Sequence, residues 1–211
     1  LSPFVSLLRQ LFVAIVLGFA LSLVIWFFRR LTNNIGTVFN TWDAVVAWNS
    51  WAQIWSTNFI PDQTGMYPQL LPANLSITYL LMANTEVVLF AKAIMPLFSI
   101  LIIFTLLELG VEQKKAGYFL AIIFTYLMFK KFTGDILTDG YADIPATFMA
   151  FIAFAHVFRV EHILEDKRAL LLGGVIAAGA ALTKQVGVFV VAAYFILAVL
   201  ADTAALKKHW K

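Results

Sequence analysis

Six side chains in this sequence combine ionisable chemistry with a shared position relative to the apolar segments. They are Asp43, Asp62, Asp135, Asp139, Asp143 and Lys184. All six fall in segments that we place on one side of a membrane, whereas acidic residues elsewhere are interleaved with lysine and arginine, as in ordinary solvated loops. Carboxylates can act as general bases, and an ammonium group can stabilise a nearby anion. The set predicts a site in which an anionic headgroup lies beside a general base.

Asp43 belongs to an amphipathic stretch from Asn40 to Phe59. Its apolar stripe has spacings of four, three, four and four residues and consists of Ala44, Trp48, Trp51, Trp55 and Phe59. The polar residues Asp43, Asn49, Ser50 and Gln53 lie off this stripe. Indole rings favour the headgroup layer of a bilayer, so we predict a helix that rests its aromatic face on the membrane.

Asp43 also has a purely structural interpretation. If Asn40 is the N-cap, Asp43 occupies the third helical position, where an acid offsets the helix dipole. An acid at a helix start beside a membrane can serve both purposes, so catalysis and helix stabilisation stay open at this residue.

Asp143 and Lys184 each have two interpretations as well. Asp143 stands two residues before Pro145, where it is either a helix N-cap or a group that acts on a ligand. Lys184 interrupts an apolar stretch, where an ammonium group must reach water or pair with an anion. It is therefore either an anion-binding group or a snorkelling anchor at the end of a span.

A metal site is a further alternative for the acidic loop. Asp135 and Asp139 precede Asp143 at four-residue steps, but Gly134 and the Asp139-Gly140 pair indicate turns, so the three acids do not share one helical face. Hard divalent cations bind clustered carboxylate oxygens, so a divalent metal stays possible, although no cofactor is firmly implied. We interpret the three acids as a solvated loop.

Composition sets the class of protein. Of the 211 residues, 62% are hydrophobic and 15% aromatic, and the mean hydropathy is +0.87, which excludes an ordinary soluble globule. The absence of cysteine excludes disulfides and thiolate chemistry. The net charge of +3 comes from lysines and arginines near span ends, so we expect no nucleic-acid partner.

A membrane-length window predicts an all-α bundle of about six spans. These are residues 11–28, 87–109, 116–132, 144–160, 169–183 and 187–204. The apolar segment 70–82 is short and opened by prolines, so we interpret it as interfacial or partly inserted, with a crossing as the alternative. Residues 29–86 then form a long external juxtamembrane segment that contains the amphipathic helix.

Basic residues orient this arrangement. With six spans, the basic loops at 114–115, 159–168 and 207–211 share one side with Arg9, and the positive-inside rule makes that side cytoplasmic. Arg29 and Arg30 fall on the other side and are expected to snorkel to headgroups. Lys92 and Glu86 are interpreted as interface charges, although Lys92 needs a partner or a snorkelling path. Leu1 in place of an initiator methionine suggests that residues 1–211 belong to a longer protein.

A small-residue ladder gives the remaining structural prediction. Gly173, Ala177 and Ala181 recur every four residues, with Gly174 and Ala178 beside them. Such ladders let helix backbones approach closely, so we interpret this one as a packing face.

Short motifs in a fixed order resemble those of a known family. They are Thr41-Trp42-Asp43-Ala44 after the first span, Tyr67-Pro68-Gln69-Leu70-Leu71-Pro72, Gly140-Tyr141-Ala142-Asp143-Ile144-Pro145, and Ala181-Leu182-Thr183-Lys184-Gln185. This order is similar to the N-terminal module of GT-C glycosyltransferases, in the group of protein O-mannosyltransferases and aminoarabinose transferases. The resemblance covers nearly the whole chain, as spaced short motifs.

The resemblance implies an integral-membrane inverting glycosyltransferase. It implies that a sugar passes from a polyprenyl-phosphate donor to a lipid, glycan or protein acceptor on the external or luminal face of a plasma, inner or ER-type membrane. Asp43 would deprotonate the acceptor, Asp143 would position a substrate, and Lys184 would hold the donor phosphate. Trp42, Tyr67 and Gln69 are candidate substrate-binding residues. The alternatives are a transporter or flippase of a lipid-linked or anionic substrate, and a non-catalytic membrane scaffold.

Overall fold

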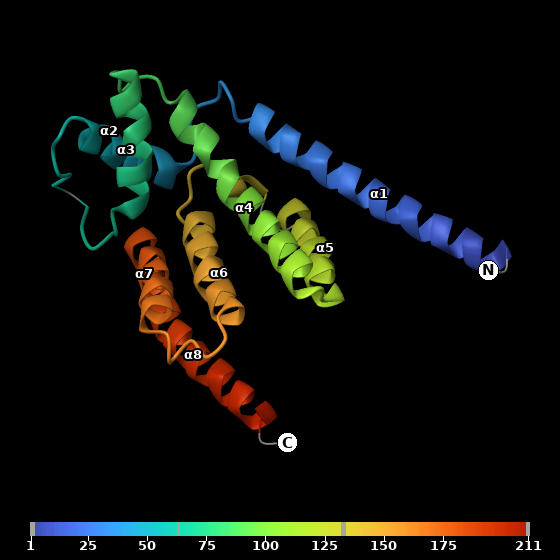
Figure 1. The fold of residues 1–211 in the computed structure, drawn as a ribbon. Coiled ribbons are helices and arrows are strands. Elements are labelled where there is room, and N and C mark those ends of the chain that lie inside the picture. Colours follow the sequence, from blue (N-terminus) through green and yellow to red (C-terminus); the bar gives the residue numbers. More distant parts are fainter. Residues whose placement is uncertain (1–2, 63, 132–133, 210–211) are drawn as a thin grey trace.

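The computed structural model describes residues 3–62, 64–131 and 134–209, which form eight α-helices and no strand (Figure 1). The helices are α1 (Pro3–Thr32), α2 (Ser50–Ser56), α3 (Leu70–Met82), α4 (Leu89–Gln113), α5 (Ala116–Lys131), α6 (Asp143–Arg159), α7 (Lys167–Thr183) and α8 (Val188–His209). Three short elements complete the fold: the π-helix η1 (Asp43–Asn49) and the 3-10 helices η2 (Gly134–Leu137) and η3 (Gln185–Gly187). The all-α prediction is confirmed.

Helix positions agree with the apolar pattern. Each of the six predicted spans overlaps one long helix, and the short apolar segment coincides with α3 at both ends. Among the residues whose side chains are described, two helical stretches are long and apolar enough to cross a membrane, Leu89–Gln113 and Gln185–Asp202. In the first stretch, more than half of its apolar 18-residue segment is buried inside the protein, which is also typical of a core helix in a soluble fold.

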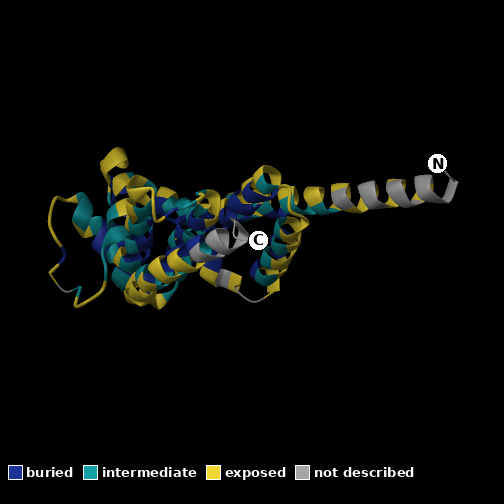
Figure 2. Ribbon diagram, turned by 60° about the horizontal axis from the view of Figure 1, so that its bottom comes forward, coloured by how far each residue is buried: buried dark blue, intermediate teal, exposed yellow. Residues whose placement is uncertain are grey.

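Three apolar clusters hold the helices together. One joins η1, α2 and α3 to the start of α4, a second joins α1, α4, α5 and α6, and a third joins α6, α7 and α8. In the second cluster Trp26 of α1 packs against Tyr126 and Phe129 of α5. Figure 1 shows that α1 extends away from the other helices toward its N-terminal end, and Figure 2 shows that the buried residues gather where the helices pack together.

The interhelical contacts sort the helix ends into two groups. At one end of the bundle, the residues after α1 contact the start of α4, the start of α6 meets the end of α7, and η3 meets the segment before α3. At the other end, Arg159 of α6 pairs with Glu108 and Glu112 of α4. The acidic and basic candidates Asp43, Asp139, Asp143 and Lys184 therefore gather at the first end, as the alternation of spans predicts.

The aromatic stripe faces the protein, which corrects our prediction. Ala44, Trp48 and Trp51 are all buried, in the cluster that joins η1 and α2 to α3. They therefore do not rest on headgroups, while Phe59 at the end of the stripe, and Trp42 just before the stripe, are largely exposed. The physical reason is that amphipathicity shows that a face avoids water but does not show what covers it. Here the apolar side of α3 covers it.

Candidate functional site

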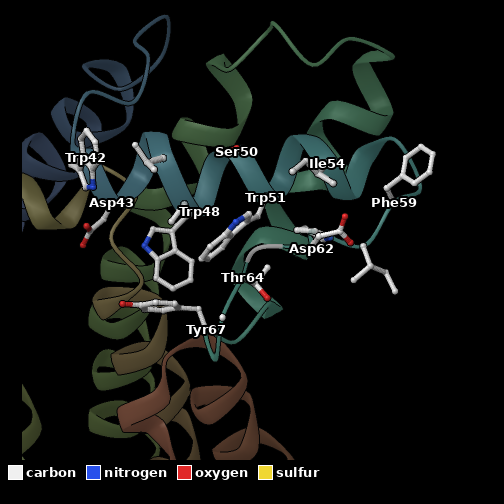
Figure 3. A pocket seen from close by; sticks show the side chains of 15 residues that line it. Trp42, Asp43, Trp48, Ser50, Trp51, Ile54, Phe59, Asp62, Thr64 and Tyr67 are labelled. Carbon is white, nitrogen blue, oxygen red and sulfur yellow. The ribbon is translucent and has the colours of Figure 1, made fainter.

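Asp43 is an exposed carboxylate at the start of η1. The helix is preceded by Trp42, whose side chain makes no capping hydrogen bond, so the predicted N-cap at Asn40 is wrong. The Asp43 side chain makes no hydrogen bond or ion pair with any residue that the structure describes, and Asp43 is one of the residues that line a hollow (Figure 3). The wide turn of a π-helix is rare and frequently marks functional positions.

The hollow has a volume of about 840 Å³ and is bounded by η1, α2 and the loop that follows α2. Its lining consists of Trp42, Asp43, Val46, Ala47, Trp48, Ser50, Trp51, Ile54, Phe59, Ile60, Pro61, Asp62, Thr64, Gly65 and Tyr67 (Figure 3). Its volume is typical of small-molecule sites. Among the predicted site residues it contains Trp42, Asp43 and Tyr67.

An aromatic group anchors one wall of this hollow. The rings of Trp48 and Trp51 meet edge to face with centroids 5.4 Å apart. The Tyr67 ring lies 5.7 Å from Trp48 and 5.9 Å from Trp51. This packing fixes the loop that carries Tyr67 against η1 and α2, and such edge-to-face contacts contribute beyond the area they bury.

Gln69 supports the loop and does not line the hollow. Its side-chain oxygen accepts a hydrogen bond of 3.1 Å from the Trp55 indole, and its amide donates to the Tyr67 carbonyl at 3.0 Å. Both bonds stiffen the turn before α3. In the structure Gln69 holds the loop in place, and the substrate contact that the sequence predicts for it stays a prediction.

Asp143 and Lys184 form an ion pair. The Lys184 Nζ lies 2.5 Å from Asp143 Oδ1, and both side chains remain partly exposed. The residue before α6 is Ala142, which makes no capping hydrogen bond, so Asp143 is not the N-cap. Lys184 follows the last turn of α7 in an extended conformation. Pairing with an anion, one of the options left open for this lysine, is thus observed.

The ion pair adjoins the hollow without lining it. Gln185, next to Lys184, donates a hydrogen bond of 3.1 Å to the Met66 carbonyl in the loop beside Tyr67. Ala44 and Ala142, the neighbours of the two aspartates, lie in one apolar cluster. Of the three charged candidates, Asp43 lines the hollow, whereas Asp143 and Lys184 stand outside its lining.

A buried ion pair that the sequence does not predict holds the segment leading into η1. Lys92 Nζ lies 3.2 Å from Asp139 Oδ1 and donates to the Val38 carbonyl at 2.7 Å. Asn34 donates to the Lys92 carbonyl at 2.8 Å, and Thr41 donates to the Asp139 carbonyl at 2.9 Å. Lys92 and Asp139 are buried, so neither is the interface charge or solvated acid that we expect from sequence. The sequence signal for a buried pair was the single lysine in the first turn of an otherwise apolar helix.

Gly140 lets the acidic loop approach η1. Its φ of +88° is a conformation that favours glycine, and a Cβ there would lie 2.7 Å from both Ala44 Cβ and the Phe39 ring. The turn before α6 is thereby pressed against the helix start that carries Asp43.

The acidic residues separate into different roles. Asp139 pairs with Lys92 and Asp143 pairs with Lys184, while the side chain of Asp135 lies outside the described residues. Within the described part of the chain, no three His, Asp or Glu side chains come together as a possible metal site.

Comparisons with protein families, with curated proteins and with solved structures find no match for this chain. Its chemistry must be inferred from its own residues.

Proposed function

We propose that this chain is part of an integral-membrane inverting glycosyltransferase that uses a polyprenyl-phosphate sugar donor. The observation that carries the proposal is a free carboxylate, Asp43, in the wall of a small-molecule-sized hollow, at the same bundle end as the Asp143–Lys184 pair. A general base and a cation at one end of an apolar bundle are the two groups that transfer from a lipid phosphate requires. The order of the motifs agrees with the GT-C resemblance.

The proposed arrangement has α1 and α4 to α8 crossing the membrane. The elements η1, α2 and α3 then cover the external or luminal end, since they pack over the start of α4 and the end of α7 (Figure 1). Arg159, with its two glutamate partners, lies at the cytoplasmic end. With 13 residues, α3 is too short to cross, which keeps it at the interface.

In the proposed reaction, the acceptor oxygen attacks the anomeric carbon of the sugar as the bond from that carbon to the phosphate oxygen breaks. Asp43 takes the proton of the acceptor hydroxyl, and the electron pair of the broken bond leaves on the phosphate. Lys184 has three donor hydrogens, so it can keep its contact with Asp143 and also donate to the phosphate. One displacement inverts the anomeric configuration.

Asp43→Asn tests the base. The amide is nearly isosteric but does not accept a proton at neutral pH, so transfer from a panel of radiolabelled polyprenyl-phosphate hexoses and pentoses should fall at least about 100-fold in reconstituted vesicles. Thermal stability should be unchanged, because Asp43 contacts no described partner. Near-normal turnover of Asp43→Asn would remove Asp43 from the mechanism, whereas no transfer by the unsubstituted protein with any donor of the panel would favour the scaffold alternative.

Lys184→Ala tests the phosphate contact. Binding of polyprenyl phosphate should weaken by about tenfold or more, since a charge-assisted contact is lost. Lys184→Arg should retain part of it. Lys115→Ala, which removes an exposed lysine from the other end of the bundle, is the matched control. Unchanged donor affinity in Lys184→Ala would leave this lysine as a partner of Asp143 alone.

A further inference from the structure

The charged residues that line the hollow beside η1 are all acidic. Its lining contains two carboxylates, Asp43 and Asp62, and no lysine, arginine or histidine. Lys184 lies outside the lining and forms an ion pair with Asp143. An anion inside the hollow would therefore face two like charges, whereas a cation would be attracted from both.

Five of the other thirteen lining residues are aromatic. They are Trp42, Trp48, Trp51, Phe59 and Tyr67. Ring faces carry negative charge density and attract ammonium groups, with tryptophan the strongest of the three ring types. In Figure 3 the rings of Trp48, Trp51 and Tyr67 lie between Asp43 on one side and Asp62 on the other. The mutual contacts of these three rings hold this surface in place without a ligand.

The exposure of the lining leaves groups accessible to a ligand. Trp42 and Phe59 are 77% and 70% exposed, so their rings can contact a ligand, whereas Trp48 and Trp51 are buried. Asp62 is exposed and makes no hydrogen bond or ion pair with a residue that the structure describes. A volume of about 840 Å³ accommodates an ammonium group with its substituents.

We propose that this hollow binds an organic cation, a primary or quaternary ammonium group held by aromatic rings with Asp62 as its counter-charge. The assignment goes beyond the proposed function, because it gives the hollow a ligand whether or not sugar transfer occurs. It also separates two subsites by charge: an aromatic, acidic one for the ammonium group, and the Lys184 end for an anion. The ammonium group can belong to a soluble amine or to a lipid headgroup.

The test is a binding measurement on the full chain in detergent, without any transfer reaction. Choline, ethanolamine and the neutral choline isostere 3,3-dimethylbutanol are titrated at constant ionic strength, and the quenching of tryptophan fluorescence is followed. Choline or ethanolamine should bind about tenfold or more tightly than the neutral isostere, since the charge is the main difference. A short-chain phosphatidylcholine, below its micelle concentration, separates the two sources, because a headgroup ligand binds as the lipid and poorly as free choline.

Two exposed residues supply the variants, so folding should be preserved. Asp62→Asn should weaken binding of the ammonium probes by about fivefold. Trp42→Ala should weaken it several-fold and should weaken binding of the neutral isostere less, whereas Asp62→Asn should leave binding of the isostere unchanged. Asp166→Asn, which changes the N-cap of α7 away from the hollow, is the control for a general loss of charge.

The proposal would be overturned if the neutral isostere bound as tightly as the best-binding ammonium probe, the phosphatidylcholine included. It would also be overturned if none of choline, ethanolamine and the phosphatidylcholine bound. Ammonium binding that Asp62→Asn and Trp42→Ala leave unchanged would overturn it as well. Failure of sugar transfer in other experiments would not, since the measurement depends on binding alone.

Discussion

Replacing Lys92 by methionine tests whether the buried ion pair holds the segment between α1 and η1. Methionine keeps most of the length of the side chain but removes the charge that lies 3.2 Å from Asp139. Asp139 then stays buried without compensation, and the Val38 carbonyl loses its donor. The change is therefore an electrostatic one at nearly constant volume.

The geometry sets the expected size. At 3.2 Å and an effective dielectric constant of about 20, the attraction between two unit charges is about 5 kcal/mol. Breaking a buried pair by removing one partner costs about 3 to 5 kcal/mol in unfolding free energy. For a chain of this size, that corresponds to a drop in midpoint temperature of about 6 to 20 °C.

The assay is thermal unfolding in a fixed detergent, followed by circular dichroism. The double variant Lys92→Met with Asp139→Asn should lose less stability than Lys92→Met alone, because no charge is left buried without a partner. Glu108→Gln is the control: its carboxylate lies 2.6 Å from Arg159, closer than the buried pair, but is exposed. Its loss should cost about 1 kcal/mol or less.

Equal effects of Lys92→Met and Glu108→Gln would refute the reasoning. They would mean that the Lys92–Asp139 pair is solvated in the folded protein and does not fix the segment between α1 and η1. A large effect with a smaller one in the double variant would confirm that burial, not the contact distance, decides what each pair contributes.

Two further predictions concern the packed interior. Burial raises the pKa of Tyr79 from 10.0 to about 12, so the unfolded chain loses this proton first and stability should fall by about 2 to 3 kcal/mol as pH rises from about 10 to 12. Tyr79→Phe should remove that part of the pH dependence of the unfolding free energy, and identical pH profiles would contradict it. Gly173→Ala should destabilise by about 1 to 3 kcal/mol, because its Cβ would lie 2.2 Å from the Tyr194 hydroxyl. Gly174→Ala, whose nearest contact of 3.6 Å is ordinary, should stay within about 1 kcal/mol in the same melting experiment, and equal losses would refute the packing argument.

Local patterns account for the parts of the fold that sequence predicts. The long helices follow from apolar runs of sufficient length, and α3 begins and ends where its apolar run does. The small-residue ladder also behaves as expected, since Gly173 and Ala177 are buried where α7 meets α8. In each case, the information lies within a few turns of one helix.

The candidate site was only partly predictable, because it brings together residues that lie far apart in the sequence. Sequence singled out Asp43, Asp143 and Lys184, because charged groups beside apolar runs need an explanation. It did not pair Asp143 with Lys184 through spacing, since 41 residues separate them. Nor did it find Asp62 as a wall of the hollow, because an acid in a loop has no local signal for a cavity.

By itself, the sequence determined which segments are helical, the apolar class of the chain, and that the acidic and basic candidates share one end of the bundle. Periodicity and length are local properties, and alternation of helix directions follows from them. Tertiary structure alone decided that α3 covers the indoles of Trp48 and Trp51, that Lys92 is buried with Asp139, and that Asp43 stays free beside a hollow. Those outcomes depend on which surfaces meet across long stretches of chain, and a free energy of burial depends on the partner as well as on the residue.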